Sequence, residues 1–132
     1  MLKKISLLLT LGILILATSC AKEVQPEEVY YVKYVSSGFR SSYNYDISYA
    51  DENGKGVSLR NYKGEDFERI IGPVSKGFSA QHSIRGSYAL NVQHTINLRI
   101  EVKQGDGPFV VKKDVARTLS DYVTQTIYYT VK

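Results

Sequence analysis

Hydrophobic and polar residues alternate along most of the chain after residue 28, with the two-residue period that is typical of β-strands. Residues 43–50 show the pattern most clearly, because three tyrosines and an isoleucine alternate there with small or polar residues. This segment is predicted to be a half-buried strand with an aromatic face toward the core. No segment of the chain shows a convincing helical period.

A turn signal follows this strand at Asn53-Gly54, because both residue types tolerate the positive φ angles of tight hairpin turns. Residues 57–62 are therefore predicted to be the returning strand of a hairpin. A second alternation runs over 15 residues, from 88 to 102, and as one strand it would measure roughly 50 Å. A small domain cannot contain such a strand. We therefore expect a bend or bulge near residues 91–94 and a regular strand over about 95–103.

The spacing of the strands predicts an all-β fold. With residues 29–35 as the first strand and 122–131 as the last, about seven strands fall within about 100 residues. This favours a single antiparallel immunoglobulin-like β-sandwich over residues 29–132 rather than a closed barrel. Because the chain has no tryptophan and no cysteine after Cys20, tyrosine, valine, isoleucine and leucine are expected to fill a disulfide-free core.

Residues 1–19 have the pattern of a secretory signal, because Lys3 and Lys4 precede an apolar run that ends near Ala17. The run is too short to cross a membrane as a helix, which needs roughly 20 apolar residues. The chain is therefore expected to be exported.

The residues that end this run, Ala17-Thr18-Ser19-Cys20, resemble the lipobox of bacterial lipoproteins. The resemblance implies that Cys20 receives a diacylglycerol and fatty acyl chains such as palmitate, and becomes the first residue of the mature chain. Ala21 follows the cysteine in place of aspartate, which resembles lipoproteins carried to the outer membrane. Residues 20–28 are then the lipidated cysteine and a polar, flexible tether. The alternative is an ordinary secretory signal with an incidental cysteine, although a lone thiol is a reactive liability in an exported protein.

The basic character of the precursor is largely a property of its signal. The 132 residues include 17 Lys and Arg against 13 Asp and Glu. Removing Lys3 and Lys4 with the signal leaves 15 basic side chains against the same 13 acidic ones. The mature chain is therefore almost neutral, and no nucleic-acid partner is predicted.

The sequence contains no motif that indicates catalysis or a cofactor. A phosphate-binding loop, a nucleophile elbow and a zinc-protease motif are all missing. His82 and His94 lie in the apolar phase of their strands, so they are expected to be half-buried, hydrogen-bonded core residues rather than metal ligands. The turn at residues 51–54 offers oxygen ligands for calcium, but the chemistry of a hairpin explains the same residues. We therefore predict no enzyme activity, no cofactor and no metal site.

The chain is rich in tyrosine, with 11 residues, and the positions of these tyrosines suggest a binding surface. Two adjacent pairs occur at residues 30–31 and 128–129, and neighbours on a strand point to opposite faces. The phase of the flanking residues sends Tyr31 and Lys33 outward on the first strand and Tyr128 outward on the last. We predict one exposed patch of Tyr31, Lys33 and Tyr128, suited to a glycan ring or a protein. The alternative is that these tyrosines are ordinary exposed strand residues.

Several strand and turn stretches resemble small bacterial lipoproteins whose extracytoplasmic domain is similar to the carboxy-terminal β-sandwich of MmpS proteins. The stretches with this resemblance are VKYV at 32–35 followed by Gly38, YDISYADENG at 45–54, KGFSAQ at 76–81 and INLRIEV at 96–102. The resemblance implies the β-sandwich fold and a role as a small accessory partner of a membrane transporter. The chain departs from MmpS proteins in lacking their cysteines and in its turn at residues 104–108, which reads QGDGP.

Together these features predict a non-catalytic, lipid-anchored protein of the outer membrane, on its cell-surface or periplasmic face. It is expected to work through surface contacts with an envelope protein. An alternative is an MmpS-like periplasmic accessory of a transport or envelope complex. A further alternative is a surface lipoprotein that binds a carbohydrate.

Overall fold

The computed structural model describes residues 26–41, 43–63, 65–87, 93–119 and 123–132. The predicted signal peptide at 1–19, Cys20 and the first part of the tether lie outside the described residues, so the structure does not bear on them. The predicted bend near residues 91–94 lies partly outside them as well. No helix in the described part of the chain is long and apolar enough to cross a membrane.

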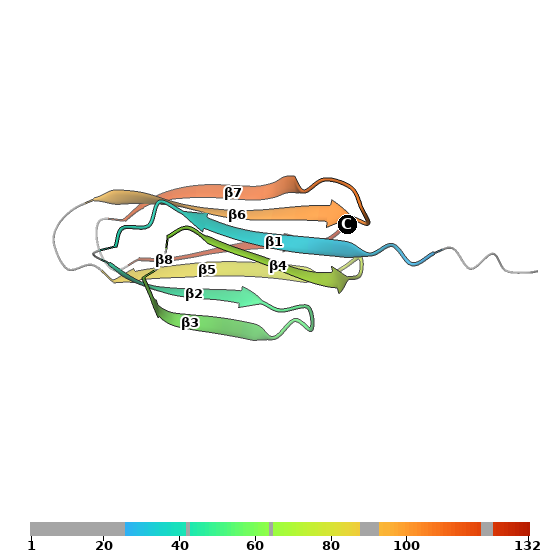
Figure 1. Ribbon diagram of the computed structural model, residues 1–132, viewed down its shortest axis with the longest axis horizontal. Helices are drawn as coiled ribbons and strands as arrows, with labels where there is room; N and C mark the ends of the chain where they lie inside the picture. Colours follow the sequence, from blue (N-terminus) through green and yellow to red (C-terminus); the bar gives the residue numbers. More distant parts are fainter. Residues whose placement is uncertain (1–25, 42, 64, 88–92, 120–122) are drawn as a thin grey trace, which may run out of the picture.

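The described residues form eight β-strands in two four-stranded antiparallel sheets that pack face to face (Figure 1). The predicted single antiparallel sandwich is confirmed, with eight strands instead of about seven. In chain order the strands are β1 (Tyr30–Ser37), β2 (Asn44–Ala50), β3 (Gly56–Tyr62), β4 (Phe67–Val74), β5 (Ser79–Ser87), β6 (His94–Gln104), β7 (Val110–Leu119) and β8 (Val123–Thr130).

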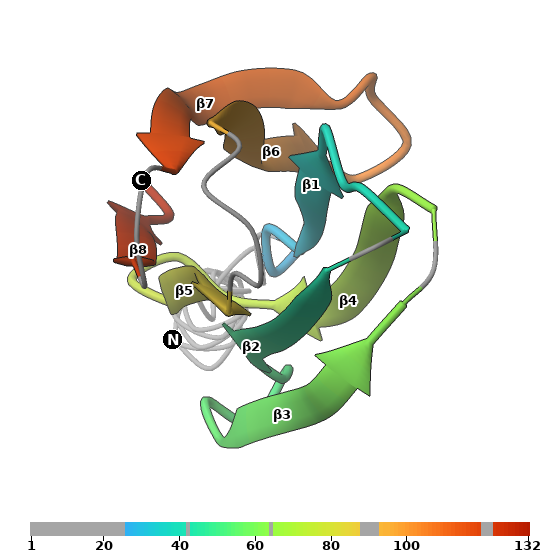
Figure 2. The ribbon, with the colours of Figure 1, turned by 90° about the vertical axis from the view of Figure 1, so that its left-hand side faces the viewer.

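The first sheet has the strand order β4-β1-β6-β7, and the second has the order β3-β2-β5-β8. Only the β2–β3 and β6–β7 connections stay within one sheet, and every other connection between the described strands crosses to the other sheet. The β3–β4 and β7–β8 connections cross at the two edges of the sandwich (Figure 2). As a result β1 is an interior strand of the first sheet, whereas β8 is an edge strand of the second.

Alternating side chains of both sheets fill the space between them. On β1 the pattern of buried and half-buried residues is strictly alternating, with Tyr30, Val32 and Tyr34 inside. On the second sheet Tyr45 and Ile47 point inward and are almost fully buried. The Tyr34 hydroxyl donates a hydrogen bond to the carbonyl oxygen of Ala50 at 3.0 Å and so joins the two sheets. The expected tyrosine-rich core is confirmed.

The predicted hairpin between β2 and β3 is confirmed, with a positive φ at Gly54 (+76°) but not at Asn53. The Asp51 amide donates to the Lys55 carbonyl at 2.8 Å, and the Gly54 amide donates to the Asp51 carbonyl at 2.9 Å. One Asp51 carboxylate oxygen accepts the amides of Asn53 and Lys55 at 2.9 and 2.8 Å. This carboxylate closes the turn, as hairpin chemistry predicts.

The pairing of β6 with β7 contains an irregularity that matters for the site described below. Ile100 pairs with Lys113 and Glu101 pairs with Val111, so Lys112 is an additional residue without a direct partner. Such a bulge bends the strand and changes the direction of nearby side chains.

Candidate functional site

Both imidazoles lie between the sheets, away from solvent. His82 is completely buried, and its Nε2 atom lies 2.6 Å from the Ser36 hydroxyl oxygen. Its Nδ1 atom lies 3.3 Å from the Ser48 carbonyl oxygen, which can only accept a hydrogen bond. Burial lowers the pKa of His82 to about 4, so the ring is neutral near pH 7 and accepts from Ser36. A substrate cannot reach this serine and histidine pair.

His94 is also a core residue. Its Nε2 atom lies 2.8 Å from the Tyr45 hydroxyl, and its ring lies 4.7 Å from the ring of Tyr43, centroid to centroid. Burial raises the pKa of Tyr45. Within the described ranges, no three residues of His, Cys, Asp and Glu are placed to hold a metal ion. Hydrogen-bonded core histidines were expected here, and both are more deeply buried than predicted.

Tyr31 and Lys33 lie together on the outer face of the first sheet, within a group that we call the lysine–aromatic cluster: Tyr31, Lys33, Glu101, Lys103 and Phe109. The Lys33 Nζ atom forms an ion pair with Glu101 at 2.5 Å and lies 4.8 Å from the centre of the Phe109 ring. Lys103 Nζ lies 4.8 Å from the centre of the Tyr31 ring. Pairing of β1 with β6 brings these residues together, and the sequence pattern indicated only the first two.

The predicted patch that joins Tyr31 with Tyr128 is wrong. Tyr128 is 60% exposed, and because its neighbour Ile127 is buried it lies on the outer face of the second sheet. Tyr31 lies on the outer face of the first sheet, next to the buried Val32. Since β1 pairs with β4 and β6 whereas β8 pairs with β5, the whole sandwich separates the two rings.

The outer face of the second sheet carries a shallow hollow of about 310 Å³. Four of its eight lining residues are serine or threonine, and Arg60 and Arg85 also line it. Register places Tyr128 opposite Gln81, which lines a second hollow on the same face. The side chains that line the larger hollow include Asp46, Ser48, Ser58, Arg60, Ser83, Arg85 and Thr124.

At the edge where β7 and β8 run side by side (Figure 2), residues of both sheets line another opening. We call it the edge cleft. Its volume is about 340 Å³. Its floor consists of buried apolar residues, and its rim is formed by partly exposed ones. The residues that line it are Tyr30, Val102, Gln104, Gly107, Pro108, Val110, Lys112, Tyr129, Val131 and Lys132.

The edge cleft lies at the end of the sandwich from which the tether leaves. Tyr30 pairs with Gln104, and the Gly105 amide donates to the Val29 carbonyl at 2.9 Å, so the chain just before β1 is fixed beside the cleft. The Tyr30 hydroxyl donates to the Glu28 carboxylate at 2.7 Å, and this bond raises the pKa of Tyr30. The cleft therefore adjoins the described residues that precede β1.

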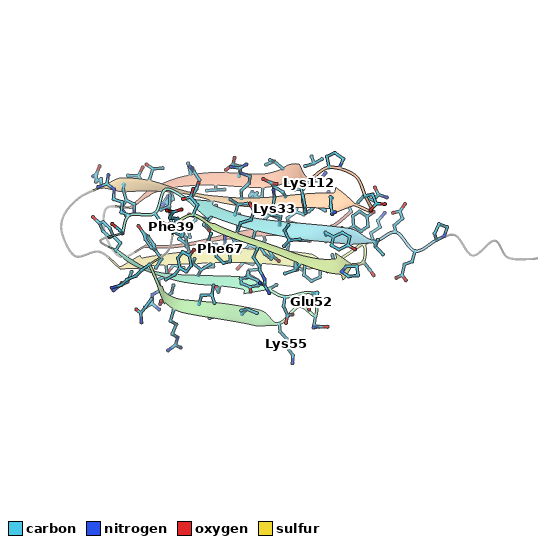
Figure 3. The ribbon with its side chains drawn as sticks, viewed as in Figure 1. Lys33, Phe39, Glu52, Lys55, Phe67 and Lys112 are labelled. Carbon is cyan, nitrogen blue, oxygen red and sulfur yellow. The ribbon has the colours of Figure 1, made fainter. Side chains whose placement is uncertain are left out.

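The only side chains with a full charge among the described residues that line the cleft are Lys112 and Lys132. Lys112 is the additional residue of the β7 bulge, and it lies at the tether end of the upper sheet in Figure 3. Lys132 follows β8 on the other sheet. The two ammonium groups thus belong to opposite walls of an opening whose floor is apolar and whose lining also includes the polar side chain of Gln104.

The opposite edge of the sandwich is filled by aromatic rings instead. Tyr62 of β3 and Phe67 of β4 meet edge to face, with their centroids 5.9 Å apart. Phe39 lies 5.7 Å from Tyr62 and also stacks on Tyr45 at 4.4 Å. These rings close the space between the sheets at the β3 and β4 edge. The two edges therefore differ, and the sequence pattern alone indicated neither the closed edge nor the cleft.

In comparisons with known proteins, no protein-family model and no curated protein sequence matches the chain.

Proposed function

We propose that the protein is a non-catalytic, lipid-anchored binding or accessory module of the cell envelope. The observation that carries this proposal is the edge cleft, an opening with an apolar floor and two lysines at the end of the domain that faces the tether. A protein held through Cys20 presents this end to the membrane. The serine and histidine groups that resemble catalytic machinery are buried, which supports a binding role.

The anchor itself is proposed from the sequence. Fatty acyl chains hold a protein by burying methylene groups, each of which contributes about 0.8 kcal/mol, and more than one chain makes the attachment stable. Residues 21–29 separate Cys20 from the first strand, so the domain would remain close to the bilayer. The MmpS-like resemblance supports an accessory role in a transport or envelope complex.

Metabolic labelling with a palmitate analogue tests the anchor. The wild-type chain should incorporate the label and sediment with outer membranes, whereas Cys20→Ala should incorporate none. Ser19→Ala is the matched control, because it keeps a small residue before the cysteine and should label like the wild type. Equal labelling of Cys20→Ala and the wild type would overturn the proposed attachment.

Two further measurements separate the accessory and surface roles. Protease treatment of intact cells should degrade a domain on the cell surface and leave a periplasmic one intact. Affinity purification of the lipidated protein in mild detergent should recover a transport or envelope complex if the accessory role is correct. Purification of the protein without such a complex would argue against that role.

A second candidate function, carbohydrate binding, is favoured by the hydroxyl-lined hollow beside Arg60 and Arg85. Sugar hydroxyls suit such side chains, and the exposed Tyr128 ring on the same face offers a surface on which a sugar ring stacks. A glycan panel tests this candidate with the wild type, Tyr128→Ala and Arg60→Ala, and with Lys55→Ala as a control. A glycan bound equally by all four proteins would place its site elsewhere, and a silent panel would count against the candidate.

A further inference from the structure

We propose that the edge cleft binds a single fatty acyl chain whose anionic head group pairs with Lys112 and Lys132. The inference rests on the proposed function, because the Cys20 anchor is what brings the tether end of the domain to a lipid surface. It adds a ligand class to the binding role.

The interior of the edge cleft suits a hydrocarbon chain. Tyr30, Val102 and Val131 form a floor that is already shielded from water, and no more than 6% of any of them is exposed. Val110, at the rim, is 48% exposed, which is unusual for a valine that faces the space between two sheets. An acyl chain in the cleft would cover Val110 and gain about 25 cal/mol for each Å² of apolar surface removed from water.

The size of the edge cleft limits the ligand to one chain. Its volume of about 340 Å³ lies at the small end of the range for small-molecule pockets, about 300–1,000 Å³. An engineered apolar cavity of about 150 Å³ holds one benzene molecule, so this cleft holds an acyl segment of roughly ten carbons. The cleft is open on one side, and the head group would remain at the mouth.

Charge complementarity assigns an anionic head group. Lys112 and Lys132 come from opposite walls, and no acidic side chain lines the cleft among the described residues. Glu28, whose carboxylate accepts the Tyr30 hydroxyl at 2.7 Å, is not among the residues that line the cleft. Ammonium groups in this position would form charge-assisted hydrogen bonds with a carboxylate or a phosphate.

An extended peptide strand added to the open edge of β7 fits the surface less well. Lys112, Lys113, Asp114 and Arg117 are all exposed on this ten-residue strand, and β7 also contains the bulge. Charged side chains and bulges are the devices by which edge strands avoid pairing with another strand. A lipid needs only the mouth of the cleft and not the length of β7.

Photolabelling tests the inference on the full lipidated protein in nanodiscs of phosphatidylcholine. The probe is a ten-carbon fatty acid with a diazirine at its methyl end. Labelled peptides should map to residues 102–112 and 129–132, and decanoate should compete better than decanol. Lys112→Glu combined with Lys132→Glu should lower labelling about tenfold, because two charge-assisted contacts become repulsive.

Matched variants separate the cleft from general effects of charge. Lys55→Glu reverses the charge of one lysine at the tether end of the second sheet, away from the cleft, and should label like the wild type (Figure 3). Val110→Trp should block the mouth without disturbing the buried floor and should also reduce labelling. Thermal unfolding of each variant confirms that its fold is intact.

Competition with the photoprobe distinguishes a membrane lipid from a free fatty acid as the source of the ligand. Phosphatidylglycerol in the nanodisc should compete if a membrane lipid is the natural ligand, and only added decanoate should compete if a free fatty acid is. Both results support the inference. Labelling that is spread over the domain, or that is unchanged in the double lysine variant, would overturn it. If the wild-type protein incorporated no palmitate at Cys20 but the photoprobe still labelled the cleft, the proposed anchor would be wrong and the proposed acyl-chain site would stand.

Discussion

The Ser36 hydroxyl oxygen lies 2.6 Å from Nε2 of His82, and both residues are completely buried between the two sheets. Ser36 belongs to β1 of the first sheet and His82 to β5 of the second, so this hydrogen bond joins the layers of the sandwich. The His82 ring can take part in this way only as a neutral imidazole. That requirement makes the stability of the domain depend on pH.

We expect the free energy of unfolding to fall as the pH decreases from about 6.5 toward 4. The folded-state pKa of His82 is about 4, below its usual value of 6.5, so the unfolded chain binds more protons between these values. A depression of this size corresponds to about 3 kcal/mol, all of it present above pH 6.5. Urea unfolding monitored at several pH values between 7.5 and 4.5 measures the effect.

The control for this prediction is His82→Gln, which has an amide in place of the titrating ring. This variant should be less stable at pH 7.5, but its stability should change less between pH 6.5 and 4.5 than that of the wild type. Carboxylates contribute equally to both proteins, so the difference isolates the imidazole. Equal pH dependence in both would contradict the assignment to His82.

The hydroxyl of Tyr34 is expected to contribute more to stability than the hydroxyl of Tyr128. The first donates to the Ala50 carbonyl at 3.0 Å inside the core, where burial raises the pKa of Tyr34. Tyr34→Phe should therefore lower the free energy of unfolding by about 1 kcal/mol. Tyr128→Phe should leave it unchanged within about 0.5 kcal/mol, because the ring is exposed. Denaturant unfolding of both variants decides the point.

The ion pair between Lys33 and Glu101 should show measurable coupling. Glu101 is only 7% exposed although it lies on an outer face, and Arg99 also contacts it at 3.2 Å. In a double-mutant cycle with Lys33→Met and Glu101→Gln, we expect a coupling energy of about 1 kcal/mol. This exceeds the few tenths typical of exposed pairs. A coupling energy near zero would mean that solvent screens the pair fully.

Gly72 should tolerate substitution poorly. Its φ angle is +128°, and a Cβ atom there would lie 2.9 Å from the Tyr30 carbonyl oxygen and 2.9 Å from Cδ1 of Tyr31. Gly72→Ala should lower the free energy of unfolding by about 1–3 kcal/mol, through backbone strain and displacement of Tyr31. Gly56→Ala is the control, since nothing lies within 4 Å of its added methyl group. Thermal unfolding of both variants provides the comparison.

Most of the fold could be predicted because the signals for strands are local. The alternation at residues 43–50 is a property of neighbouring side chains, and the structure has β2 at Asn44–Ala50 with the tyrosines inside. The Asn53-Gly54 turn is equally local. The bend near residues 91–94 was predicted only from the length of the alternating segment. The irregularity that the structure describes is the bulge at Lys112, and it depends on how β6 pairs with β7.

The candidate site was less accessible to prediction, because it depends on which strands become neighbours. The outward directions of Tyr31 and Tyr128 follow from strand phase, and the structure has Tyr31 half-buried between buried neighbours and Tyr128 exposed. Their common patch required β1 and β8 to be adjacent, and the strand order places them in different sheets. Lys103 and Phe109, which complete the surroundings of Tyr31 and Lys33, are more than 60 residues away along the chain.

The sequence by itself determined the strand periodicity, the inward and outward faces of the first, second and last strands and a core rich in tyrosine. These follow from contacts between residues that are close in the chain, whereas the prediction that Cys20 carries a lipid follows from the resemblance of residues 17–20 to a lipobox. Tertiary structure alone decided which faces lie together, that aromatic rings close one edge, and that the other edge opens between Lys112 and Lys132. Those features depend on packing between segments that are distant in the chain, and the periodicity of a single strand carries no information about that packing.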